Sequence, residues 1–255
     1  MRIISLGLGI QSTAMYLMSS LGDIHRADYA IFADPGAELP DTYRLWNYLN
    51  KWASKNNGIP LIKKKKSLYK DILKSSKDGS RVASIPAFTE SSGIVRRQCT
   101  KEYKIDVVIS VIREIYGLKK GQHMKPTKLY LGISFDEIQR MKISTLYNID
   151  YEYPLVDKRL TRSHCIDILE QHDFHNVKKS SCFFCPYHSN AAWKDIKTNY
   201  SEEWKKAIKI DKAIRNNDKL NDKLYLHRSL KNIEEAYLQE DQEELFMCEE
   251  GYCGI

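Results

Sequence analysis

The chain has 255 residues, 42% of them hydrophobic, which is enough to bury the core of one large domain. No stretch resembles a secretory signal peptide or reaches the ~20 apolar residues of a membrane span, so we expect a soluble cytoplasmic protein with no membrane partner. The net charge of +7, from 40 Lys+Arg against 33 Asp+Glu, suits a polyanionic or phosphorylated partner without requiring one.

The first part of the chain predicts alternating strands and helices. Apolar runs at 2–8, 27–34 and 58–63 are typical of buried strands. Between them, residues 11–22 and 40–56 carry apolar stripes at helical spacing. Strands joined by crossover helices pair in parallel with right-handed connections. The pattern therefore predicts an α/β fold, with a mostly parallel sheet flanked by helices.

The rest of the chain predicts one further strand and several helices. These elements are an amphipathic helix over 103–118, a strand over 128–134, a helical segment over 153–174 entered through a turn from Thr161 to His164, and charged helices over 191–216 and 230–246. We divide the chain into an α/β domain over residues 1–190 and a helical C-terminal extension over 191–255.

The loop after the first strand, ISLGLGIQST (4–13), predicts a phosphate-binding site. Ligands of open parallel sheets bind at the carboxyl ends of the strands. Gly7 and Gly9 let the backbone approach an anion, and the next helix offers unpaired N–H groups at its start. The residues expected to contact the phosphates are Ser5, Gly7, Gly9, Gln11, Ser12 and Thr13. The alternative is a glycine turn that only packs the strand against the helix.

The spacing of this loop matches neither GxxxxGK[ST] nor GxGxxG, because Ser12 occupies the last position of the second motif. It does resemble the SGGxDS PP-loop of ATP pyrophosphatases and of phosphoadenylyl-sulfate (PAPS) reductases. Gly7 and Gly9 then stand at the first Ser and the second Gly. Gln11 stands at the Asp and Ser12 at the last Ser.

Five more segments, in the same order along the chain, resemble the PAPS reductase-like family of the adenine-nucleotide α-hydrolase superfamily. They are IFADPGAELPDTY (31–43), RRQCTKEYKI (96–105), LGISFDEIQRMK (131–142), YPLVDKRLTRSHCIDIL (153–169) and SSCFFCPYH (180–188). The resemblance covers about residues 1–190. It implies a Rossmann-like, HUP-type fold and an enzyme that binds an adenine nucleotide.

Charged side chains in these segments are the further candidates for the nucleotide site. The basic candidates are Arg96, Arg97, Lys101 and Arg140. Arginine holds phosphate or sulfate through two hydrogen bonds, and lysine supplies a compact charge. Asp34 and Glu38 follow the second strand, where they would bind a ribose hydroxyl or Mg²⁺. The alternative for residues 96–104 is an exposed approach to a helix.

Six cysteines in a cytosolic chain favour metal, redox or nucleophilic use over disulfides. Cys182 and Cys185 form a CxxC motif that fits zinc, iron–sulfur or dithiol chemistry. The resemblance implies a [4Fe-4S] cluster, and its expected ligands are Cys99, Cys182, Cys185 and Cys248. Thr100 replaces the second cysteine of a pair found in cluster-bearing relatives.

Zinc and the absence of any metal are the alternatives to the cluster. His188 follows the CxxC motif and would serve as a zinc ligand, or it caps the next helix. Cys165 lies on an apolar helix face, so we expect it in the core. Cys253 precedes Gly254 near the end of the chain, similar to the terminal Glu-Cys-Gly of PAPS reductases, although Tyr252 replaces the Glu.

The resemblance implies two enzymatic functions, and a non-catalytic nucleotide-binding regulator is the third hypothesis. We favour ATP-dependent sulfur transfer with Mg²⁺, in which an acceptor such as tRNA or DNA is adenylated and then thiolated, with Ser12 and Arg97 as catalytic residues. The alternative is reduction of PAPS, or of its 3′-unphosphorylated relative, by attack of Cys253 and resolution by a thioredoxin-like reductant.

Four aromatic residues lie among lysines in the region after residue 190: Trp193, Tyr200, Trp204 and Tyr225. They either stack on the bases of a nucleic acid or pack the helices onto the core. Exposed helical faces could pair between two copies of the chain, so a homo-oligomer is one of the alternatives.

Overall fold

The computed structural model describes residues 1–79, 84–91, 93–216 and 222–239. The chain forms two compact units. The first unit contains residues 1–34, 40–65 and 105–180, and the second contains 35–39, 66–104 and 181–255. The expected boundary at residue 190 does not coincide with this division, because the second unit also takes two earlier segments of the chain.

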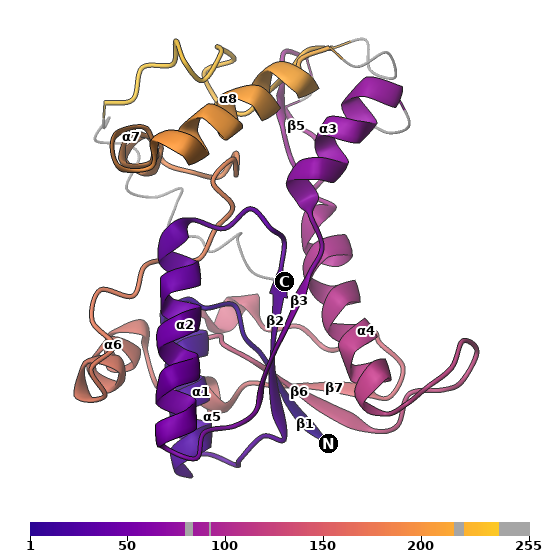
Figure 1. The fold of residues 1–255 in the computed structure, drawn as a ribbon, viewed down its shortest axis with the longest axis vertical. Coiled ribbons are helices and arrows are strands. Elements are labelled where there is room, and N and C mark those ends of the chain that lie inside the picture. The colour runs from indigo at the N-terminus through magenta and orange to yellow at the C-terminus, as the bar shows by residue number, and fades with distance from the viewer. Residues whose placement is uncertain (80–83, 92, 217–221, 240–255) are drawn as a thin grey trace. The chain divides into compact units, whose positions relative to one another are not determined.

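A five-stranded parallel sheet forms the centre of the first unit (Figure 1). Its strands, in spatial order, are β3 (Leu61–Lys65), β2 (Tyr29–Asp34), β1 (Arg2–Ser5), β6 (Thr127–Leu131) and β7 (Ile149–Glu152). Every neighbouring pair runs parallel. The predicted α/β fold with a mostly parallel, Rossmann-like sheet is confirmed, although strand β7 was not predicted.

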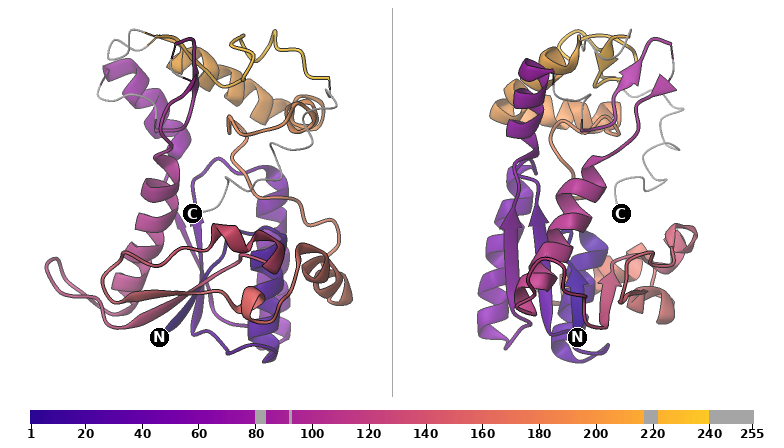
Figure 2. Two further views of the ribbon diagram at one scale, coloured as in Figure 1. Left: turned by 180° about the vertical axis from the view of Figure 1, so that it is seen from behind. Right: turned by 90° about the vertical axis from the view of Figure 1, so that its right-hand side faces the viewer.

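Helices cover both faces of this sheet. They are α1 (Ile10–Leu21), α2 (Pro40–Lys55), α4 (Asp106–Ile115), α5 (Pro154–Asp157) and α6 (Arg162–Gln171), and a 3₁₀ helix, η2 (Phe135–Arg140), follows β6. Ile4, Phe32 and Tyr130 pack in one buried cluster with residues of α1, α2 and α6. Successive strand residues alternate between faces, and α4 contacts β2 on the opposite side from α1 and α2 (Figure 1, and Figure 2, left).

The second unit combines helices with a small antiparallel sheet. Its helices are α3 (Leu68–Asp78), α7 (Asn190–Asn199) and α8 (Ser201–Ile214), and its strands are β5 (Gly93–Ile94), β4 (Phe88–Thr89) and β8 (Leu224–Tyr225). A π-helix, η1 (Lys101–Ile105), leads into α4. The small sheet and α3 were not predicted.

The aromatic residues of α7, α8 and β8 are buried. Trp193, Tyr200 and Trp204 belong to the hydrophobic core of this unit, and Tyr225 is also buried. The Trp193 and Trp204 rings meet edge to face, with their centroids 6.4 Å apart. The hypothesis that these aromatic side chains stack on nucleic-acid bases is therefore wrong, and the alternative that they pack the core is confirmed.

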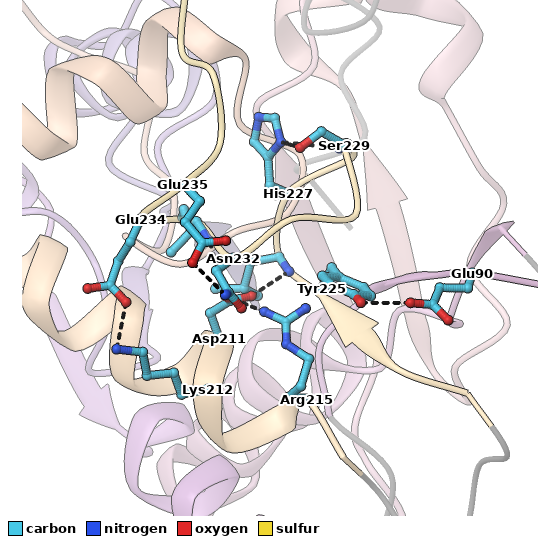
Figure 3. Close-up of polar contacts among 12 residues, drawn as sticks. Glu90, Asp211, Lys212, Arg215, Tyr225, His227, Ser229, Asn232, Glu234 and Glu235 are labelled. Carbon is cyan, nitrogen blue, oxygen red and sulfur yellow. Dashed lines mark hydrogen bonds and ion pairs between the residues drawn. The ribbon is translucent and has the colours of Figure 1, made fainter.

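The predicted helix over 230–246 is wrong for residues 230–239, which form turns; residues 240–246 lie outside the described ranges. Side chains of α8 organise this segment instead (Figure 3). The Asp211 carboxylate accepts hydrogen bonds from the backbone N–H groups of Leu226 (2.9 Å) and Ile233 (3.2 Å) and pairs with Arg215. The buried Asp211 carboxylate thus holds the backbone at Leu226 and Ile233, and Glu235 N and Ala236 N donate to Asn232 O in a turn.

Buried His227 should make the protein less stable in acid. Its Nε2 lies 2.8 Å from Asn190 Oδ1 and its Nδ1 2.7 Å from Ser229 Oγ, and burial lowers its pKa from 6.5 to about 4. Below pH 6.5 the unfolded chain binds a proton that the folded chain does not. The free energy of unfolding should therefore fall by roughly 3 kcal/mol in total as the pH drops from 6.5 towards 4.

Urea unfolding of the wild type and of His227→Gln, followed between about pH 7.5 and 4.5, measures this loss. We expect the variant to show a smaller decrease over that interval, because glutamine does not titrate. An equal decrease in both proteins would contradict the assignment to His227.

Candidate functional site

The predicted phosphate loop lies where the strand order of the sheet reverses. The chain adds β2 and β3 on one side of β1, and later adds β6 and β7 on the other. Ser5, the last residue of β1, pairs with Leu131, the last residue of β6. The loops 6–9 and 132–134 therefore leave the sheet side by side. Such switch points are the usual ligand sites of open α/β sheets.

The loop turns sharply into α1. Leu8 is buried and has a φ of 57°, a left-handed conformation that is uncommon outside glycine. Gly9 is the N-cap of α1, and Ser12 Oγ lies 3.3 Å from both its N and its O. The Ser12 side chain thus fixes the turn, while the start of α1 directs its backbone N–H groups out of the helix.

The glycines of the site differ in what surrounds them. A Cβ built on Gly7 would meet only Ser12 Oγ, at 3.7 Å, and one on Gly9 only Ser180 N, at 3.8 Å. A Cβ on Gly132 would lie 2.9 Å from both N and Cα of Ser12. Packing between loop 132–134 and α1 therefore requires glycine at 132. The described protein leaves space beside Gly7 and Gly9, as a backbone that approaches an anion needs.

Gln11 and Arg140, two predicted residues far apart in sequence, meet through Glu137. Gln11 Nε2 lies 3.4 Å from Glu137 Oε2, and Arg140 Nη1 lies 2.6 Å from the same oxygen. Glu137 on η2 was not singled out from the sequence. The only feature of the sequence that could have indicated Glu137 is its position within the family-like segment 131–142. The Glu137 carboxylate thus links the Arg140 guanidinium to the side chain of Gln11, the second residue of α1.

The other predicted side chains of the first unit are less accessible. Thr13 is fully buried, and its Oγ1 has no hydrogen-bond partner within the described ranges. Ser5 is half-buried. Asp34 is buried and accepts a hydrogen bond of 2.9 Å from the Tyr43 hydroxyl. Ser134, which the sequence did not indicate, is a second buried hydroxyl that has no partner in the described chain.

The remaining predicted nucleotide-binding residues belong to the second unit. Glu38 is buried, with Oε1 3.9 Å from Lys104 Nζ, and its backbone forms a β-bridge with Cys182. The Arg97 guanidinium lies 5.9 Å from the centroid of the Tyr187 ring. Arg96 and Lys101 are exposed. The structure thus brings Glu38 and Cys182 together.

The CxxC motif forms a tight turn. Cys185 N donates to Cys182 O over 3.0 Å, and His188 Nε2 lies 2.8 Å from the same oxygen. Ser189, and not His188, caps α7 through its side chain. Cys99 and Cys182 both pack against the core of the second unit.

Within the described ranges, no three His, Cys, Asp or Glu side chains are arranged to hold a metal ion. The [4Fe-4S] ligand set of Cys99, Cys182, Cys185 and Cys248 stays a prediction. Cys248 and Cys253 lie outside those ranges. Cys165 is in the core of the first unit, as predicted, and burial raises its pKa to about 12.

No protein-family model matches the chain, and no curated protein matches it either. Of the helices that the structure describes, none is both long and apolar enough to cross a bilayer.

Proposed function

We propose that the chain binds the phosphates of an adenine nucleotide at the loop of residues 5–13. The observation that carries this proposal is the position of the loop, at the carboxyl end of β1 where the strand order reverses. There the first turn of α1 offers N–H groups to an anion, and the helix dipole favours negative charge. Open space beside Gly7 and a guanidinium at Arg140 fit the same ligand.

We further propose that the nucleotide is ATP and that it serves sulfur transfer. The six segments that resemble the PAPS reductase-like family support the adenine nucleotide, and the CxxC turn supports sulfur chemistry. An oxygen of the acceptor would attack the α-phosphorus of ATP, and the bond to the β-phosphate would break. A sulfur nucleophile would then displace AMP from the adenylated carbon. A nucleic acid, tRNA or DNA, is the proposed acceptor.

The chain's own residues have separate roles in this reaction. The start of α1 would hold the β- and γ-phosphates and stabilise the charge on departing pyrophosphate. Arg140 would add a cation, oriented by Glu137. Ser12 would keep the loop in shape through its contacts with Gly9. No step of this reaction is routed through the predicted [4Fe-4S] cluster or through zinc; metal analysis after anaerobic purification tests for either.

The experiment compares two nucleotides with the full-length, anaerobically purified chain. With Mg-ATP and a tRNA or DNA mixture, we expect pyrophosphate release that falls at least about tenfold in Ser12→Ala. Ser163→Ala, an exposed position on α6, is the matched control and should behave as the wild type. Thermal unfolding of each variant reports whether the fold is intact.

With PAPS in place of ATP, sulfite release that is lost in Cys253→Ser would overturn sulfur transfer in favour of sulfonucleotide reduction. Tight nucleotide binding without turnover of either compound would favour the non-catalytic regulator.

A further inference from the structure

The loop between α4 and β6 concentrates unpaired positive charge. Residues 115–135 include Lys119, Lys120, Lys125 and Lys128, and no aspartate or glutamate. Lys119, Lys120 and Lys125 are exposed, and none of them forms an ion pair within the described ranges; Lys128 pairs with Glu152. The loop projects from the edge of the sheet in Figure 1. The Lys125 ammonium also lies 5.6 Å from the centroid of the Tyr116 ring. No carboxylate of the described chain pairs with any of the three ammonium groups, so all three can contact a polyanion.

This loop is held in place by side chains beneath it. Arg113 of α4 donates to the carbonyl oxygens of Lys119 (2.6 Å) and Gln122 (3.0 Å). The Gln122 side chain accepts from Lys119 N over 2.6 Å, which closes a turn around residues 119–122. Asn148 donates to the carbonyl of buried Met124 over 2.7 Å. The backbone of the loop would therefore lose little conformational entropy when the lysines bind a partner.

An exposed aromatic ring contacts the same loop. Tyr147, just before β7, is 69% exposed, and its ring centroid is 5.4 Å from that of His123 in the loop. Neighbouring Ile143 is 93% exposed. Large aromatic side chains are normally buried, so a ring that contacts His123 and is still largely exposed is suited to stacking.

The surface is distinct from the nucleotide site. The loop precedes β6, and Tyr147 precedes β7, so both lie at the amino ends of the strands. The phosphate loop follows β1, which is parallel to β6. The lysine loop and the phosphate loop therefore lie at opposite ends of the parallel strands. The inference below does not depend on the proposed nucleotide chemistry.

We propose that Lys119, Lys120, Lys125 and Tyr147 form a binding surface for single-stranded nucleic acid. Lysines neutralise the phosphates of the strand, while an open aromatic ring stacks on an unpaired base. A duplex offers the same phosphates but keeps its bases stacked on each other. The combination of unpaired cations with one open ring therefore selects a single strand, without reading its sequence.

Fluorescence anisotropy with labelled oligothymidine and oligouridine, without added nucleotide, tests this surface. Because three phosphates would be neutralised, log K should fall with log salt with a slope of about −2. Lys119→Gln/Lys120→Gln/Lys125→Gln should bind at least about tenfold more weakly and lose most of this slope. The control, Lys51→Gln/Lys55→Gln/Lys158→Gln, removes the same charge from exposed lysines of the same unit and should bind within about twofold of the wild type.

Variants at Tyr147 distinguish binding of a single strand from binding of other polyanions. Tyr147→Ala should weaken single-strand binding about tenfold, whereas Tyr147→Phe, which keeps the ring, should bind as the wild type. A duplex of equal length should bind the wild type more weakly than either single strand. The proposal is overturned if no single strand binds, if both lysine triples weaken binding equally, or if Tyr147→Ala leaves binding unchanged and duplex or heparin competes equally well. Circular dichroism checks that each variant is folded.

Discussion

Replacing Gly7 with alanine should abolish tight nucleotide binding and leave the fold intact. The Cβ would meet only Ser12 Oγ, at 3.7 Å, which is an ordinary contact, and Gly7 does not have a positive φ. Alanine is therefore compatible with the backbone of the nucleotide-free protein. The same Cβ would occupy the space in which the backbone approaches a phosphate. We expect the dissociation constant for ATP to rise at least about tenfold, because each lost charge-assisted hydrogen bond costs about 1.5–3 kcal/mol.

Gly22 provides the matched control for this substitution, because it stands at the other end of the same helix. It has a φ of 94°, in the left-handed region, and no atom lies within 4 Å of a Cβ built there. Gly22→Ala should cost about 1–2 kcal/mol of stability through backbone strain and leave ATP affinity unchanged. Gly7→Ala should therefore change the ATP affinity measured by calorimetry, and Gly22→Ala should change only the temperature of thermal unfolding.

If Gly7→Ala bound ATP as tightly as the wild type, the loop would not contact phosphate. If instead it unfolded at a much lower temperature, the glycine would serve packing, which is the alternative interpretation of the motif.

Much of the first unit was predictable because its signals are local. Apolar runs marked β1, β2 and β6, and Gly22 marked the end of α1. Strand β3 was placed too early, since it continues through Lys63 to Lys65. A run of lysines reads as a solvated loop, but at the edge of a sheet exposed lysines are compatible with a strand and protect it from further pairing.

The second unit was harder to predict because its secondary structure depends on contacts between residues far apart in the sequence. Strands of two residues, such as β4 and β8, have no periodicity of their own. The segment 230–239 has charges at helical spacing, yet it forms turns, and the buried carboxylate of Asp211 accepts a hydrogen bond from one of its backbone N–H groups, that of Ile233. The chain also crosses between the two units several times without a change in composition.

At the candidate site, the residue types were predictable and their contacts were not. The glycine and hydroxyl pattern singled out the loop as a candidate, and the family-like segments singled out Arg140. Nothing in the sequence places Glu137 between Gln11 and Arg140, because that contact depends on how η2 packs beside α1. The left-handed turn at Leu8 was also hidden, because leucine rarely adopts it.

Gly132→Ala should reduce both stability and nucleotide affinity, unlike the substitution at Gly7. A Cβ at position 132 would lie 2.9 Å from N and Cα of Ser12, so backbone and not a flexible side chain must move. Overpacking of this kind costs about 1–3 kcal/mol. The atoms displaced belong to the first turn of α1, whose N–H groups are the proposed phosphate ligands.

Thermal unfolding with and without Mg-ATP separates the two effects. A ligand at 100 times its dissociation constant stabilises the folded state by about 2.7 kcal/mol. The wild type should gain this stability when Mg-ATP is added. Gly132→Ala should unfold at a lower temperature without ATP and gain little from it, because part of the binding energy of ATP would be used to restore the position of α1. A variant that starts lower but gains as much as the wild type would show that the start of α1 does not hold the phosphates, and the site would have to be sought elsewhere along the carboxyl edge of the sheet.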